Sequence, residues 1–182
     1  MMKKGLKRNK GFTLIETLVS LAILTTAVVA MIWVSGNGVS ESLYSKNKII
    51  ANYLAQEGVE IVRNIRDGEV AGGAGWDGFM DTVSDCSPST GCTIDATPIV
   101  AAISIQQCVS EPGKICNKNF FLTPGGFYTH QAVGTATSFR RKIVVAPVGA
   151  SEATVTVTVT WEQSGKTKTI VIGNYLSSWQ PE

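Results

Sequence analysis

The sequence predicts an α+β protein in which one long N-terminal helix packs on an antiparallel β-sheet. Three patterns lead to this fold class. Residues 12–34 are almost entirely apolar, residues 43–65 carry an apolar stripe at helical spacing, and residues 153–161 alternate between apolar and polar side chains. A chain of 182 residues is long enough to bury a core. Its hydrophobic share of 44% and charged share of 16% exclude intrinsic disorder for the whole.

Positive charge is concentrated in the first ten residues, which hold five of the 16 Lys and Arg residues and no acid. This segment carries +5, whereas the remaining 172 residues hold 11 basic and 14 acidic residues and sum to −3. A basic head before an apolar run is typical of a chain inserted into a membrane with that head in the cytoplasm. The net charge of +2 argues against a strongly basic nucleic-acid-binding protein.

The apolar run at residues 12–34 is long enough to cross a bilayer as a helix. It could be a cleaved signal peptide with Val28-Val29-Ala30 as its cleavage site, a plain signal anchor, or a segment cut before its apolar part. Glu16 is the one charge in the run. An acid at the centre of a membrane helix costs about 2.5–3.5 kcal/mol, so this carboxylate calls for a function and a partner.

Residues 10–16 read KGFTLIE, which resembles the prepilin processing site of type IV pilins and type II secretion pseudopilins. The resemblance implies that the prepilin peptidase cuts between Gly11 and Phe12 and that Phe12 is then N-methylated. It also implies that Glu16 pairs with the N-terminal amine of a neighbouring subunit during assembly. An ammonium and a carboxylate are both costly in lipid, and pairing them between subunits offsets both costs.

The same resemblance implies a pilin-like fold and a structural role without enzymatic activity. The chain would be a minor pilin or pseudopilin of a type IV pilus or type II secretion-like filament, with other such subunits and the prepilin peptidase as partners. It would cross the cytoplasmic membrane once, with its head outside, before entering the filament. A major pilin, an adhesive or DNA-uptake pilin whose head binds a ligand, and a secreted enzyme remain as alternatives.

Four parts are expected on this basis. They are a cleaved leader (1–11), a transmembrane and assembly helix (12–34), an amphipathic helix that continues the stem (35–67) and a disulfide-containing β-rich head (68–182). Gly36 and Gly38 weaken the helix between the second and third parts. They indicate either a helix end or kink, or a stretch that melts or bends in a filament.

The amphipathic helix should bury one stripe and expose a charged face. The stripe consists of Leu43, Ile50, Leu54, Ile61 and Ile65. The charged residues expected largely off this stripe are Glu57, Glu60, Arg63 and Arg66. The helix should stop near Asp67-Gly68, and the five glycines within residues 68–78 predict a flexible loop after it.

The head holds all four cysteines, Cys86, Cys92, Cys108 and Cys116. Three pairings are open. We favour Cys86 with Cys92 and Cys108 with Cys116, because each bond closes a short loop rich in turn residues, in a head that can oxidise outside the cytoplasm. The C-x5-C and C-x7-C spacings do not match zinc sites, so no metal is expected, and no cofactor motif is present.

The remaining chain predicts β-strands. The candidate ranges are 120–122, 126–130, 139–145, 153–161 and 167–172. Ser164-Gly165 predicts a hairpin turn, so the last three strands should form an antiparallel meander whose apolar face covers the stem. The tail at 175–179 could pack back or lie at an interface.

Two polar features of the head are interpreted as structural. His130 is the only histidine, and no acid or cysteine stands at a spacing that marks a partner, so a surface or strand position is expected. The basic run Arg140-Arg141-Lys142 is interpreted as a solvated strand face rather than as a contact for DNA. Nucleic acid is therefore not expected as a partner.

Overall fold

The structure is a computed structural model, and it describes residues 11–98, 100, 102–108, 116 and 118–178. Most of the expected leader, residues 1–10, and Trp179 of the tail lie outside the described residues. The elements are α1 (Leu14–Ala71), α2 (Gly75–Thr82), the 3-10 helix η1 (Ser84–Cys86), β1 (Cys92–Asp95), β2 (Ser104–Gln107), β3 (Phe121–Leu122), β4 (Tyr128–Thr129), β5 (Thr135–Ala136), β6 (Arg140–Pro147), β7 (Glu152–Gln163) and β8 (Lys166–Ser177). The predicted α+β class is confirmed.

The chain divides into two compact units, Met1–Tyr44 and Ser45–Glu182, and α1 contributes to both. This helix is continuous across Gly36 and Gly38, so the alternative of a helix end there is wrong. It also continues past the expected stop and ends at Ala71. Gly73 then takes a φ of 84°, a conformation that suits glycine and ends the helical run.

The glycine-rich stretch after α1 is not the loop that its composition predicts, because it contains α2. Two apolar residues hold this short helix in place. Phe79 is fully buried, and the ring of Trp76 packs on it with centroids 5.2 Å apart. Thr82 donates a hydrogen bond to Glu69 of α1 at 2.8 Å. Burial of Phe79 and the bond from Thr82 to Glu69 thus outweigh the weak helix propensity of Gly75 and Gly78.

The predicted meander is confirmed in the five-stranded antiparallel sheet, whose order is β2-β1-β6-β7-β8. Gln163 pairs with Lys166, which leaves Ser164 and Gly165 as a two-residue turn. Their φ values of 51° and 71° are those of a type I′ turn, whose twist matches that of the flanking strands. Residues 121–122 and 128–129 also form strands, as expected, but in a separate sheet of order β4-β3-β5.

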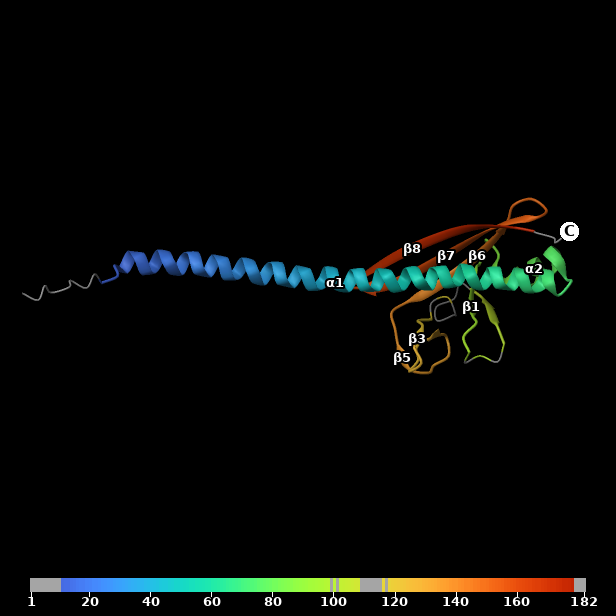
Figure 1. Cartoon of the computed structure of the whole chain (residues 1–182), viewed down its shortest axis with the longest axis horizontal. Coiled ribbons are helices and arrows are strands. Elements are labelled where there is room, and N and C mark those ends of the chain that lie inside the picture. Colours follow the sequence, from blue (N-terminus) through green and yellow to red (C-terminus); the bar gives the residue numbers. More distant parts are fainter. Residues whose placement is uncertain (1–10, 99, 101, 109–115, 117, 179–182) are drawn as a thin grey trace, which may run out of the picture. The chain divides into compact units, whose positions relative to one another are not determined.

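In the unit Ser45–Glu182, the second half of α1 lies along the meander, and β6, β7 and β8 are seen beside it in Figure 1. Asn47 contacts the end of β7 through Gln163 at 3.4 Å, and Arg66 donates to the carbonyl of Ser177 at 3.2 Å. The helix therefore runs in the direction of β8. It approaches closely at Gly58, where an added Cβ would lie 3.0 Å from Val157.

The buried faces largely follow the predicted patterns. The inward side chains of β7 are buried as expected, namely Val155, Val157, Val159 and Trp161. In α1, Leu54, Ile61 and Ile65 are buried and Ile50 is half-buried. Two expectations are wrong: Leu43 is 52% exposed, and Arg66 is buried rather than on the charged outer face. Arg66 is buried because its guanidinium contacts both Asp67 and the end of β8.

Candidate functional site

The expected cleavage point, between Gly11 and Phe12, lies just before the start of α1. Gly11, Phe12 and Thr13 precede α1 in non-helical conformation, and the Phe12 side chain is 80% exposed. Thr13 caps the helix, since its carbonyl accepts from the backbone N–H of Glu16 at 3.1 Å and its Oγ1 lies 3.4 Å from the same nitrogen. The peptide bond between Gly11 and Phe12 therefore lies outside regular structure, one residue before the cap.

Glu16 occupies the third helical position after Thr13, so the two residues have the spacing of a capping box. Its side chain is exposed, and an acid in the first turn interacts favourably with the helix dipole. This capping pattern, T-x-x-E, is a second property of Glu16 that sequence analysis missed although the motif is visible in residues 13–16.

The first half of α1 is apolar and has nothing packed over it among the described residues. An 18-residue window of α1 reaches a mean hydropathy of 2.3 with none of it buried, so one helix is long and apolar enough to cross a membrane. Its hydroxyl groups bond within the helix. Thr17 donates to the Leu14 carbonyl at 2.8 Å, and Ser20 donates to the Glu16 carbonyl at 2.8 Å. Such local bonds let hydroxyls enter a lipid environment at low cost.

A comparison with models of known protein families gave a match that lies in this N-terminal segment. Residues 6–32 match the family model described as "Prokaryotic N-terminal methylation motif". Neither the curated proteins nor the solved structures gave a match to the chain. The segment thus carries the methylation motif of prepilins at the head of a long apolar helix, and in this respect the chain is type IV pilin-like.

The head contains two disulfides, one joining Cys86 to Cys92 and the other joining Cys108 to Cys116. This is the pairing that the short loops favour. Cys86 and Cys92 are fully buried, whereas Cys116 is half-buried. Among the described residues, no group of three or more His, Cys, Asp and Glu side chains is placed to hold a metal ion.

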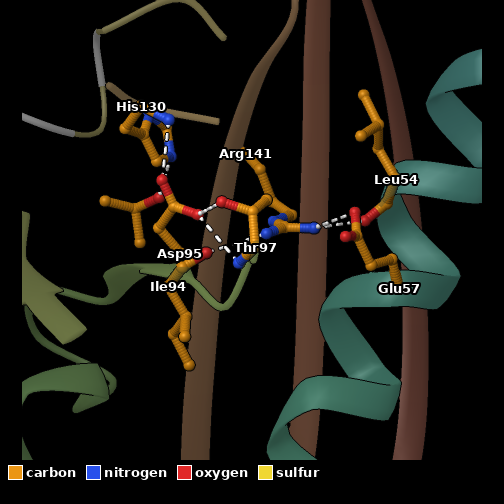
Figure 2. A network of polar contacts seen from close by, with 8 residues as sticks. Leu54, Glu57, Ile94, Asp95, Thr97, His130 and Arg141 are labelled. Atoms are coloured by element: carbon orange, nitrogen blue, oxygen red, sulfur yellow. Dashed lines mark hydrogen bonds and ion pairs between the residues drawn. The ribbon is translucent and has the colours of Figure 1, made fainter. Parts of the chain in front are cut away.

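The strongest polar feature of the head is a network centred on Arg141 of β6 (Figure 2). Its guanidinium donates to the carbonyl of Leu54 at 2.9 Å, to the carboxylate of Glu57 at 3.0 Å and to the carbonyl of Ile94 at 2.8 Å. It also lies 5.0 Å from the centre of the Phe120 ring. The network thus ties α1, β1 and β6 together.

The interpretation of Arg140-Arg141-Lys142 as a solvated strand face is therefore wrong for Arg141, which is 2% exposed. Arg140 and Lys142 are half-buried on the other face of the strand. The alternation of side chains along a β-strand could have predicted the burial of Arg141, because Arg141 lies on the same face as Ile143 and Val145, which are both buried. Burial lowers the pKa of Arg141, and Glu57 and Asp95 oppose that shift.

Asp95, at the end of β1, connects this network to the second sheet. Its carboxylate accepts two bonds from Thr97, one from the Thr129 hydroxyl at 2.6 Å and one from the backbone N–H of His130 at 2.9 Å. Burial alone would raise the pKa of this carboxyl, but the four hydrogen bonds hold it below its ordinary value. Asp95 is buried and was not recognised from the sequence, since its partners are 34 and 35 residues away.

His130 lies at the edge of the same network and therefore does have a neighbouring acid. Its ring stacks on Phe120 with centroids 4.2 Å apart, and its Nε2 bonds to the Thr93 hydroxyl. Its Nδ1 is buried and has no hydrogen-bond partner among the described residues. Burial and the nearby Arg141 lower the pKa of His130 from 6.5 to about 4, while Asp95 acts in the opposite direction. The imidazole is therefore neutral at pH 7.

These two sites differ in character. The N-terminal residues Gly11, Phe12 and Glu16 are exposed, whereas the Arg141 network is buried and most of its polar atoms are hydrogen-bonded. A guanidinium that is buried and held by three hydrogen bonds from its terminal nitrogens is not accessible to a substrate. The N-terminal motif is therefore the candidate functional site, and the Arg141 network holds the elements of the head together.

Proposed function

We propose that the chain is a structural subunit of a type IV pilus or type II secretion-like filament, acting as a minor pilin or pseudopilin. The observation that carries this proposal is that the methylation motif and the exposed apolar start of α1 occupy the same residues. The methylation motif at residues 6–32 covers the capped start of α1 and the exposed apolar turns that follow. Apolar helix turns that no described residue covers require either lipid or like helices around them.

Processing and assembly follow from three residues. The prepilin peptidase removes residues 1–11 by cutting between Gly11 and Phe12, and Phe12 becomes the methylated N-terminus. The exposed, non-helical position of this bond supports the proposal, because a peptidase needs access to an extended backbone. Glu16 then pairs with the N-terminal amine of a neighbouring subunit and directs the docking of α1 among other helices.

The proposed topology divides the chain into the leader (1–11), the transmembrane and assembly helix (12–34), the amphipathic stem (35–67) and the head (68–182). The chain crosses the cytoplasmic membrane once, with the leader inside and the head outside, until it enters the filament. The basic leader supports this orientation, and the two disulfides support an oxidising environment for the head.

Intact mass spectrometry of the protein from its native membrane tests the proposal. The expected mass lacks residues 1–11 and includes one added methyl group. In a Gly11→Val variant, the same measurement should show the leader retained, and folding should be unaffected because no atom lies within 4 Å of a Cβ built there. A mature chain that starts at Met31 would contradict the proposal and indicate a signal peptide.

A further inference from the structure

A groove runs along α1 in the unit Ser45–Glu182, on the side that faces the turn between β3 and β4. It is lined by Ile50, Tyr53, Leu54, Gln56, Glu57 and Glu60 of α1, by Gly126 and Phe127 of the turn and by Tyr128 at the start of β4. We call it the α1 groove. Its volume of about 600 Å³ lies within the range of small-molecule sites, which are concave and mostly apolar with a few polar groups.

Aromatic rings on both walls are its first distinctive feature. Tyr53 on α1 is 69% exposed and Phe127 on the turn is 46% exposed, although large aromatic side chains gain most from burial. Tyr128 is half-buried, and its ring packs edge-on against Phe120 and Phe139. The groove therefore offers ring faces that no other described part of the head covers fully.

The turn that carries Phe127 is held in one conformation. The backbone N–H of Phe127 donates to the Thr123 hydroxyl at 3.1 Å, and the N–H of Thr123 donates to the Phe127 carbonyl at 3.0 Å. Gly126 completes the turn with a φ of 85° and a bond to the Thr123 carbonyl at 3.0 Å. A ligand that stacks on Phe127 thus meets a surface that is already formed.

The acidic side chains of the groove are compensated in charge but retain hydrogen-bonding capacity. Glu57 is paired with Arg141 at 3.0 Å, and Glu60 is paired with Arg63. A carboxylate has about four acceptor positions, so each can accept further hydrogen bonds. Both remain about half exposed, at 45% and 53% of their side-chain surface. Gln56 adds an exposed amide that can donate and accept.

This chemistry selects among ligand classes. Two carboxylates disfavour phosphates, and the paired arginines reduce the attraction for a cation. Glutamate is depleted in the cores of protein interfaces, which disfavours a second copy of the chain as occupant. Exposed ring faces beside carboxylates that can accept further hydrogen bonds suit a neutral ligand with an apolar face and several hydroxyls.

We propose that the α1 groove binds a saccharide, with a pyranose ring against Tyr53 and Phe127 and its hydroxyls donating to Glu57 and Glu60. This binding activity goes beyond the proposed role in filament assembly. It does not depend on that role, because every lining residue lies in the unit Ser45–Glu182.

The test uses the full chain purified in a zwitterionic detergent that has no sugar headgroup. Saturation-transfer NMR is recorded with glucose, galactose, N-acetylglucosamine, maltose, lactose and chitobiose. At least one of these probes should show transfer to its ring protons. Tyr53→Ala and Phe127→Ala should each weaken that binding at least tenfold. Tyr175→Ala is the matched control, because Tyr175 is 51% exposed on β8 and does not line the groove; it should change the affinity less than twofold.

Circular dichroism confirms that each variant is folded before its binding is measured. Absence of transfer to all six probes in the unmodified chain would overturn the proposal. Equal weakening by Tyr175→Ala would overturn it as well, since the binding would then not be local. Sedimentation gives the third outcome against it: self-association that Tyr53→Ala abolishes, without saccharide binding, would assign the groove to a second copy.

Discussion

Arg141 is the residue on which the contacts of the head converge, and its energetics are asymmetric. The guanidinium is almost completely buried, so its charge is costly unless it is compensated, whereas its partner Glu57 keeps 45% of its side chain exposed. Its Nε is also buried and has no partner among the described residues. Removing the charge of Glu57 should therefore change the stability of the head by a different amount from removing that of Arg141.

We predict that Glu57→Gln destabilises the head more than Arg141→Met does. Glu57→Gln keeps an oxygen that can accept from Arg141 but removes the negative charge that compensates the buried cation. Loss of one partner of a fully buried pair costs about 3–5 kcal/mol, and the cost here is smaller because Glu57 is 45% exposed. Arg141→Met removes the cost of burying the charge and leaves Glu57, which is 45% exposed, free to be hydrated. The loss is therefore limited to the donors of the Leu54 and Ile94 carbonyls and the packing of the aliphatic part of the side chain. Urea unfolding followed by the fluorescence of buried Trp161 measures both, and the reverse order would refute this asymmetry.

His130 gives the head a predicted dependence on pH. Its folded-state pKa of about 4 lies below the ordinary value of 6.5, so the unfolded chain binds more protons between these values. Stability should be full above pH 6.5 and should fall as the pH drops towards 4, by about 3 kcal/mol in total. His130→Gln should remove the fall within that window. The decline caused by Asp95, whose pKa is also lowered, should remain below pH 3.8. An unchanged slope between pH 6.5 and 4 in the variant would contradict the assignment.

At the scale of elements, strong periodicity made the structure predictable. The alternation from Val155 to Trp161 and the turn at Ser164-Gly165 gave β7, β8 and their pairing. The short strands β1, β2 and β5 were missed, because two to four residues give no period and their partners are remote in sequence. Helix α2 was missed because its glycines indicate a loop, while its stability comes from the buried ring of Phe79.

In the candidate sites too, features set by neighbouring residues were predicted, whereas features set by contacts between remote segments were not. Gly11, Phe12 and Glu16 form a local motif and were found from the sequence, although their roles remain predictions. Asp95 and the burial of Arg141 depend on contacts between segments that are tens of residues apart. The one indication in the sequence that Arg141 is buried is the alternation along β6, which places Arg141 on the same face as Ile143 and Val145.

Gly58 and Gly68 form a matched pair of glycines in α1. A Cβ on Gly58 would meet Val157 at 3.0 Å and Arg141 at 3.1 Å, whereas nothing lies within 4 Å of a Cβ on Gly68. Gly68→Ala should stabilise the head by up to about 1 kcal/mol through helix propensity. Gly58→Val should destabilise it by about 1–3 kcal/mol through overpacking. Thermal unfolding measures both changes, and a stabilised Gly58→Val variant would show that α1 does not approach the sheet so closely.

The two disulfides should differ in their response to reduction. Both sulfurs of the Cys86–Cys92 bond belong to fully buried residues, whereas Cys116 is half-buried. A dithiol reductant under native conditions should therefore open Cys108–Cys116 first. Alkylation with two isotopic forms of one reagent, before and after unfolding, measures the order by peptide mass. Earlier labelling of Cys86 or Cys92 would contradict it.

At the scale of the whole molecule, the net charge of +2 and the mean hydropathy of +0.14 are averages over two units with different properties, and they describe neither unit. The unit Met1–Tyr44 holds the exposed apolar turns of α1, and the unit Ser45–Glu182 has a buried core with two disulfides. These units require different surroundings. The proposed removal of residues 1–11 would leave a mature chain of net charge −3, because the leader holds five basic residues and no acid.

Glu16→Ala tests how the first unit is used. The substitution should leave membrane insertion intact, since it removes a charge that costs free energy in lipid. It should abolish incorporation into filaments, because the proposed partner of the Phe12 amine is lost. Glu16→Gln separates this role from helix capping, since Gln also serves in a capping box but carries no charge. Quantitative mass spectrometry of sheared filaments measures incorporation, and normal levels of either variant would remove the proposed role.

The contacts between α1 and the meander also have a mechanical meaning. If α1 is held in a filament and the head is pulled by something attached to it, the load passes across the face where Arg141 bonds to Leu54 and Glu57. The helix runs in the direction of β8, from Asn47 beside Gln163 to Arg66 beside Ser177, so this load acts in shear on many contacts at once. In the proposed filament these contacts would be loaded together in shear instead of being opened one after another, so the face between α1 and the meander would bear the tension between stem and head.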